Sequence, residues 1–205
     1  MRFLDFRTHF ERFKIFSTQD ILKWDGDFDT RRLVEWQDKN YLQKIINRWY
    51  IFSDVVLDQS LLYLMANRIY SPSYVSFESA LSFYHMIPEG VYTITSATTL
   101  KTKSFNTSSG KFVFRHMRPE LMFGYKLMEV QGHHYKIAAP EKVVLDFLYL
   151  NTALKNVHDF ESIRLNKTEC MQQIQISKLM DYLSLYKSKA LEKRVAGFLK
   201  MAQHA

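Results

Sequence analysis

Residues 30–52, TRRLVEWQDKNYLQKIINRWYIF, change their hydrophobic period halfway along. Up to Lys39 the apolar residues follow helical spacing, and Asp29 before them supplies an N-cap, which predicts a helix. After Asn40 the chain alternates between apolar and polar residues, turns, and ends in the aromatic and β-branched run WYIF. This second pattern predicts a small β-hairpin. The expected bounds are 30–39 for the helix and 41–45 and 49–52 for the two strands.

Two shorter helices are expected before this stretch. Phenylalanines spaced three to four residues apart indicate one helical face near the start of the chain, namely Phe3, Phe6, Phe10 and Phe13. Ser17 and Asp20 then form the pattern of a capped helix start, for a helix over 18–24. Helix, helix, turn, helix and hairpin is the order of a winged helix-turn-helix. We therefore expect a winged-helix DNA-binding domain over residues 1–55.

The third helix and the hairpin carry the residues expected to contact duplex DNA. In a helix-turn-helix, the first turn of this helix faces the base edges, where an arginine can pair with guanine through two hydrogen bonds. Basic residues on the wing contact phosphates, which position the protein without specifying sequence. The expected DNA-contacting residues are Thr30, Arg31, Arg32, Glu35, Lys39, Lys44 and Arg48.

The charge of the chain gives this interpretation only modest support. The sequence contains 28 Lys and Arg against 21 Asp and Glu, a net charge of +7, which favours a polyanionic partner through counterion release. Residues 1–53, however, contain ten basic and eight acidic residues, a net charge of only +2. The alternative is a winged helix that docks onto another protein, with its arginines on a solvated face.

Residues 56–205 are expected to form a second, α+β domain. Its strands predict an antiparallel meander, because short strands follow one another with turns between them, and helices are expected on either side. The predicted strands are 91–98, 112–116, 123–130 and 134–138. The predicted helices are 60–70, 77–86, 140–150, 169–186 and 189–202.

Four runs of sequence resemble the AbiEi family, the antitoxins and transcriptional regulators of type IV toxin–antitoxin pairs. Residues 66–84, ANRIYSPSYVSFESALSFY, continue into Ile87-Pro88-Glu89, and residues 138–146 read AAPEKVVLD. Residues 92–95, YTIT, lead to Lys101-Thr102-Lys103. With the wing residues 39–42, KNYL, the resemblance extends over most of residues 15–150.

The resemblance implies a winged helix that binds promoter DNA and represses its own operon. It also implies that residues 56–205 form an antitoxin domain, which counteracts a partner toxin of the nucleotidyltransferase type, by an indirect route and without a stable complex. In the wing the chain has Asn40 where the family would have Gly, and Asn tolerates the left-handed backbone that such a turn needs.

A polar surface of the second domain is the candidate antitoxin surface. Its residues are Ser73, Tyr74, Ser76, Glu78, Lys101 and Lys103. A structural role is the alternative, in which Ser76 caps a helix, Glu78 complements the helix dipole, and the two lysines lie on a solvated sheet face.

No enzyme, metal site or cofactor is expected. The sequence has no Asp/Glu-x-Lys pair of the kind that restriction-type nucleases use, and no glycine-rich phosphate loop. The Asp25-x-Asp27-x-Asp29 run resembles the start of a calcium loop, but Thr30 occupies the position that needs Gly. With the single Cys170 and no apparent signal peptide, a cytoplasmic location is expected.

Overall fold

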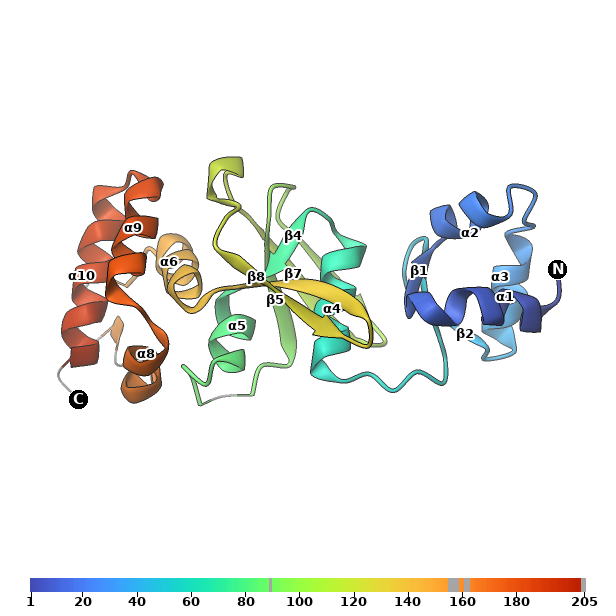
Figure 1. Ribbon diagram of the computed structural model, residues 1–205, viewed down its shortest axis with the longest axis horizontal. Helices are drawn as coiled ribbons and strands as arrows, with labels where there is room; N and C mark the ends of the chain where they lie inside the picture. The colour runs from blue at the N-terminus through green and yellow to red at the C-terminus, as the bar shows by residue number, and fades with distance from the viewer. Residues whose placement is uncertain (89, 155–158, 161–162, 204–205) are drawn as a thin grey trace.

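The computed structural model describes residues 1–88, 90–154, 159–160 and 163–203. Figure 1 shows an elongated molecule with three parts: a small N-terminal unit at one end, a β-sheet in the middle, and a layer of helices at the other end. The protein has a mixed α+β fold, as expected from the sequence. Within the described residues, no helix has both the length and the apolar character needed to cross a membrane.

The N-terminal unit contains three helices and a small sheet. Its elements are α1 (Phe3–Phe10), η1 (Glu11–Phe13), β1 (Ile15–Ser17), α2 (Thr18–Trp24), α3 (Arg31–Asp38), β2 (Leu42–Ile46) and β3 (Trp49–Phe52). Helices α2 and α3 and the hairpin lie within a residue of their predicted bounds, and Phe13, predicted on the face of the first helix, lies in η1 after α1 ends. Strand β1 was not predicted, because three residues are too few to show a period. It pairs antiparallel with β3, so the sheet order is β1-β3-β2.

Aromatic side chains fill the core of this unit. The phenylalanine face of α1 packs inward, and the Phe6 ring centroid lies 4.7 Å from those of both Phe10 and Trp36. Phe16 and Phe52 complete the contact from the sheet, with centroids 5.2 Å apart. Because aromatic rings bury a large area with few rotatable bonds, about fifty residues can form an ordered core here.

The helix ends follow the capping chemistry that the sequence predicts. The Ser17 hydroxyl accepts a hydrogen bond from the Asp20 backbone N–H at 3.2 Å, and the Asp20 carboxylate accepts one from the Ser17 N–H at 2.8 Å. After α3, Asn40 takes a left-handed φ of 56°. Its N–H donates to the Gln37 carbonyl, and the next N–H donates to the Trp36 carbonyl. This pair of bonds is a Schellman motif with Asn in the position usually taken by Gly.

The left-handed backbone at residue 40 gives a prediction about stability. Asn40→Val should lower the free energy of unfolding by about 1–2 kcal/mol, because a β-branched side chain clashes with its own backbone there. Asn40→Gly should leave stability unchanged or raise it by less than about 1 kcal/mol. Urea denaturation of the two variants would measure this, and equal stabilities would contradict the conformation.

The large sheet has six strands, and its topology corrects the predicted meander. The strands are β4 (Ser73–Val75), β5 (Thr93–Thr98), β6 (Lys103–Thr107), β7 (Gly110–His116), β8 (Tyr125–Val130) and β9 (His133–Ala138), in the order β6-β7-β5-β4-β9-β8. The β6–β7 and β8–β9 hairpins are antiparallel, but β5 pairs with β7, and β4 with β9, in parallel. The prediction of an antiparallel meander was therefore wrong. Short β4 and the polar edge strand β6 were missed, and inserting them changes which strands become neighbours.

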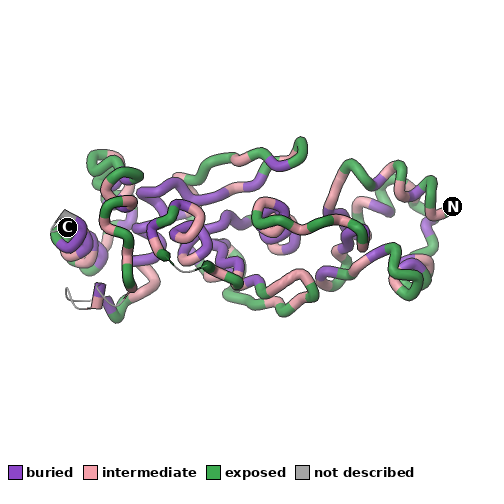
Figure 2. The backbone as a smooth tube through the Cα atoms, turned by 90° about the horizontal axis from the view of Figure 1, so that it is seen from below, coloured by how far each residue is buried: buried purple, intermediate pink, exposed green. Residues whose placement is uncertain are grey.

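Helices cover both faces of this sheet (Figure 1). On one face lies α4 (Gln59–Ile69), and the Tyr63 ring packs 5.7 Å from that of Tyr135. On the other lie α5 (Phe77–Phe83) and α6 (Pro140–Leu150). Beyond α6 lie α8 (Lys167–Gln173), α9 (Ile176–Tyr186) and α10 (Lys189–Gln203). Figure 2 shows buried backbone concentrated in the sheet and the helices next to it.

The single helix predicted over 169–186 is two helices, which corrects the sequence reading. The chain is extended at Ile174 and Gln175, between α8 and α9. Glu141 is 2 % exposed, and its carboxylate accepts a hydrogen bond from the Gln175 N–H at 3.1 Å. The same carboxylate forms an ion pair with Lys178 at 3.0 Å. A negative charge at the start of α9 also complements its dipole. This tertiary contact decides where the second helix begins.

The sheet of the N-terminal unit joins two cores. Side chains on one face of this sheet belong to the aromatic core of the N-terminal unit. Ile15, Ile45 and Ile51 belong instead to the larger core of the rest of the chain. Polar contacts flank this junction. The Gln43 amide donates to the Ser108 hydroxyl at 2.7 Å, and the His133 ring lies 2.6 Å from the Arg12 carbonyl oxygen. The two outer hairpins of the large sheet thus contact the N-terminal unit at their turns.

Candidate functional site

The exposed side of α3 is the first candidate site. Leu33 and Trp36 are buried against the core, and they define the inner side of the helix. Most of the other residues of α3 lie on its outer side. The structure places six of the seven predicted DNA-contacting residues in exposed positions and Arg32 in a half-exposed one. Five lie at or near α3, and two on the β2–β3 hairpin. They are Thr30, Arg31, Arg32, Glu35 and Lys39, then Lys44 and Arg48.

Arg31 is held by an acid at the start of its own helix. The Asp29 carboxylate accepts hydrogen bonds from Arg31 Nε at 2.9 Å and Nη2 at 2.8 Å, and also from the Arg31 backbone N–H at 3.0 Å. The side-chain hydrogen bonds from Arg31 are the main reason that the pKa of Asp29 is lowered. The sequence predicted Asp29 as the N-cap, but the N-cap position of α3 is Thr30, whose side chain makes no capping bond. Asp29, one residue earlier, bonds to the first N–H of the helix and fixes one edge of the guanidinium.

The other basic residues of the helix are also engaged. Arg32 donates to the Met1 carbonyl oxygen at 2.5 Å. Lys39 pairs with Glu35 at 2.6 Å, and this hydrogen bond is the main cause of the lowered pKa of Glu35. On the hairpin, Arg48 lies in the turn with a φ of 69°. Neither Lys44 nor Arg48 forms an ion pair within the described part of the chain, so the hairpin carries the freer positive charge.

A buried polar network is the second feature, and it contains four residues of the family-like runs. Lys142 and Asp146, one turn apart on α6, form an ion pair with both side chains 0 % exposed. Lys142 Nζ also donates to the Tyr186 hydroxyl at 2.6 Å. The Asp146 carboxylate accepts from the hydroxyls of Tyr74 at 2.8 Å, Ser76 at 2.9 Å and Tyr186 at 2.7 Å. The network therefore joins β4, the start of α5, α6 and the end of α9.

Burial sets the protonation behaviour of this network. Desolvation lowers the pKa of Lys142, and the attraction of Asp146 opposes that effect. Burial raises the pKa of Tyr74 and of Tyr186 well above the ordinary value, and the nearby charge of Asp146 adds to the effect. Both hydroxyls consequently remain protonated donors, which is the form that the carboxylate requires.

Three residues expected on an antitoxin surface lie inside the protein, which corrects that part of the prediction. Ser73, Tyr74 and Ser76 are buried, because strand β4 lies between two neighbours in the middle of the sheet. Ser76 occupies the N-cap position of α5, but its hydroxyl bonds to Asp146 and makes no capping bond. Sequence spacing alone could not show a partner 70 residues away.

The other three expected surface residues are accessible to different degrees. Lys101 and Lys103 are exposed near the β6 edge, and Lys103 Nζ lies 4.9 Å from the centroid of the Phe105 ring. Glu78, with a side chain 31 % exposed, pairs with Arg115 at 2.9 Å. Lys103 and Arg115 do not form one basic patch, because they occupy alternate positions on paired strands and so point to opposite faces.

The family-like run also fastens α5 to the sheet. The Ser79 hydroxyl donates to the Thr93 carbonyl at 2.9 Å, and the Thr95 hydroxyl donates to the Ser76 carbonyl at 2.7 Å. The Ser79 and Thr95 side chains each accept from the other's backbone N–H. Sequence reasoning missed Thr95, Lys142, Asp146 and Tyr186 as members of this polar core.

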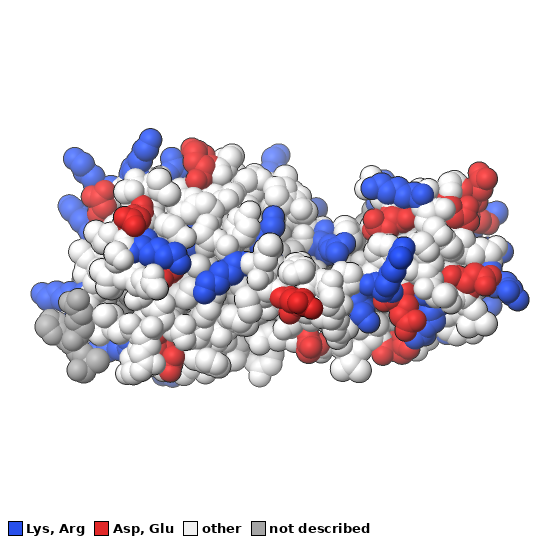
Figure 3. Space-filling view, viewed as in Figure 1, with Lys and Arg blue, Asp and Glu red and all other residues white. Residues whose placement is uncertain are grey.

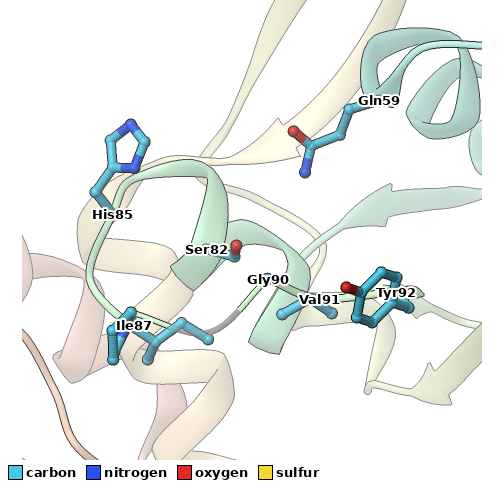
Figure 4. Close-up of a pocket in the computed structure, with 8 residues that line it drawn as sticks. Gln59, Ser82, His85, Ile87, Gly90, Val91 and Tyr92 are labelled. Atoms are coloured by element: carbon cyan, nitrogen blue, oxygen red, sulfur yellow. The ribbon is translucent and has the colours of Figure 1, made fainter.

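One surface cavity, of about 340 Å³, lies between the start of α4 and the chain after α5 (Figure 4). Gln59 and Tyr92 lie on one side of it and His85 on the other, and Gln59 is engaged with the Tyr63 hydroxyl at 2.7 Å. Its described lining residues include no charged side chain. Across the described residues, no group of three or more His, Cys, Asp or Glu is arranged to hold a metal ion.

Breaking the buried ion pair should destabilise the protein strongly. Lys142→Met leaves the Asp146 carboxylate buried without its countercharge, which should lower the free energy of unfolding by about 3–5 kcal/mol. The double variant Lys142→Met/Asp146→Leu removes both charges and should recover much of that loss. Chemical denaturation of both variants tests this, and a double variant no more stable than the single one would contradict it.

The buried tyrosines predict loss of stability in alkali. Their pKa values are higher in the folded than in the unfolded protein, so their contribution to the free energy of unfolding is fully present below the unfolded pKa of about 10 and declines as pH rises above it. Between pH 9 and 11 the melting temperature of Tyr186→Phe should fall less steeply with pH than that of wild type, because about one proton fewer is released on unfolding. Identical pH dependence of the two proteins would contradict the buried, protonated state.

Comparison with known families gives no further assignment. No protein-family model matches the chain, and a search of curated proteins finds no significant match.

Proposed function

We propose that the protein is a transcriptional regulator and antitoxin of a type IV toxin–antitoxin pair. In this role it binds promoter DNA of its own operon and counteracts a nucleotidyltransferase-type toxin. The observation that carries the DNA-binding half is the order α1, β1, α2, α3, β2, β3 with sheet order β1-β3-β2, which is typical of a winged helix-turn-helix. We assign α3 as the recognition helix and the β2–β3 hairpin as the wing.

The distribution of charge supports a DNA footprint that extends beyond α3. Figure 3 shows basic and acidic side chains interspersed over the N-terminal unit. Residues 90–119, by contrast, contain five Lys and Arg and no Asp or Glu. They include the β6–β7 hairpin, whose turn is joined to β2 by the bond between Gln43 and Ser108. Lys111, next to that turn, adds positive potential beside the wing. Farther along the segment, Arg115 pairs with Glu78, and Arg118 bonds to the Tyr186 carbonyl in the C-terminal helical layer.

The antitoxin half rests on the family resemblance together with the buried network. The runs 66–84 and 138–146 come together at Asp146, which bonds to Tyr74 and Ser76 from the first run. These polar groups are enclosed and satisfied by one another, so they support a role in holding the domain together. A non-catalytic antitoxin domain is consistent with such an arrangement.

A salt titration tests the DNA-binding half. The full chain should bind a 20-base-pair duplex with a steep negative slope of log affinity against log salt, measured by fluorescence anisotropy. Lys44→Ala and Arg48→Ala should each reduce the slope by about 1, because each removes a phosphate contact. Lys200→Ala, at the far end of α10, is the control and should leave the slope unchanged.

Co-expression tests the antitoxin half. The full chain should restore growth to cells that express the toxin encoded beside it. Arg48→Ala should rescue as well as wild type, because the DNA-binding residues lie outside the antitoxin domain. Failure of the wild-type chain to protect would remove the antitoxin assignment and leave the DNA-binding test unaffected.

A second candidate function is a protein-docking winged helix. The pairing of Arg31 with Asp29, and of Lys39 with Glu35, favours it, because these acids reduce the positive potential of α3. Weak duplex binding that does not respond to salt would support this alternative.

A further inference from the structure

We propose that Asp29 is a positioning residue that orients Arg31 for reading a guanine in the major groove. The inference rests on the proposed function and adds to it the base that the first turn of α3 recognises. Arg31 is the residue that would touch the base, and Asp29 acts through it.

The geometry at Arg31 separates the two edges of its guanidinium. Asp29 engages the edge formed by Nε and Nη2, at 2.9 and 2.8 Å. A guanidinium has five N–H donors in a planar fork, so the outer hydrogens of Nη1 and Nη2 form a second, parallel pair. That pair matches the O6 and N7 acceptors of guanine, which lie side by side at the major-groove edge. Adenine offers a donor in place of O6 and would not match.

The carboxylate is itself fixed, so it can act as a support. Besides the guanidinium, Asp29 Oδ1 accepts from the Arg31 backbone N–H at 3.0 Å. The acid is therefore tied to the start of α3, and the arginine side chain folds back to it across two residues. The Arg31 side chain is 90 % exposed, and this leaves its free edge open to a partner.

Orientation matters because a free arginine is flexible. Ordering its side chain on binding costs rotamer entropy, and a side chain that is already held loses less. The ion pair is exposed, so its effect on overall stability is small. Its effect on recognition is directional, because it selects which edge of the guanidinium faces outward.

The experiment begins with selection from a randomised 20-base-pair duplex library by the full chain. The selected sequences should contain a guanine whose enrichment disappears in Arg31→Ala. The measured quantity is the ratio of dissociation constants for the selected duplex with that G·C pair replaced by A·T and for the unchanged duplex. In Arg31→Ala this ratio should fall by about tenfold, the value of one two-bond contact.

Asp29→Asn is the decisive variant, because the Asn side-chain oxygen can still accept the hydrogen bond from the Arg31 N–H that ties residue 29 to the start of α3. It removes the charge and one acceptor oxygen, so the guanine ratio should fall by about two- to fivefold. Asp27→Asn is the matched control: it removes the same charge from an exposed residue two positions earlier, and it should leave the ratio unchanged. Affinity for unselected duplex should rise equally in both variants.

The outcomes separate the inference from the proposed function. An unchanged guanine ratio in Asp29→Asn, or an equal fall in Asp27→Asn, overturns the positioning role while duplex binding stands. A wild-type chain that selects no Arg31-dependent guanine overturns it as well. If the full chain binds no duplex at any salt concentration, both the inference and the DNA-binding proposal fail.

Discussion

The ion pair between Lys142 and Asp146 is the interaction around which the large domain is arranged. Two charges removed completely from water are tolerated only when their remaining hydrogen-bonding groups are satisfied. Here the Asp146 carboxylate accepts hydrogen bonds from three hydroxyls: Tyr74 on the sheet, Ser76 at the start of α5 and Tyr186 at the end of α9. A central strand, a helix start and the C-terminal helical layer must therefore adopt one mutual arrangement for the pair to exist.

This requirement explains why the polar residues of the family-like runs are found inside the protein. A buried carboxylate with several specific donors is costly to misplace, so it discriminates between alternative packings of the same apolar residues. Glu141, one residue before Lys142, has a similar role, because its carboxylate accepts a hydrogen bond from the N–H of Gln175, the N-cap residue of α9, and pairs with the Lys178 ammonium. Polar residues of α6 consequently fix the positions of α5 and α9.

The sequence predicted the local structure well and the long-range structure poorly. Helices α2 and α6 matched their predicted bounds, because capping residues and Pro140 act within a few positions. The strand order was wrong, because three-residue β4 shows no period of its own yet separates β5 from β9. The exposed residues of α3 were identified from helical spacing. The role of Asp146 was not, because the three hydroxyls that bond to it lie 40 to 72 residues away in the chain.

The sheet of the N-terminal unit has a consequence for modularity. Its strands supply aromatic side chains to one core and Ile15, Ile45 and Ile51 to the other. Two domains joined only by a linker each keep a complete core when they are separated. Here the small sheet packs in both cores, so separating the two parts would leave one core incomplete. The sheet that supports α3 therefore packs against the larger core as well as its own. Cutting the chain after the hairpin would expose these three isoleucines to water, so the N-terminal unit alone would carry an apolar face that the full chain covers.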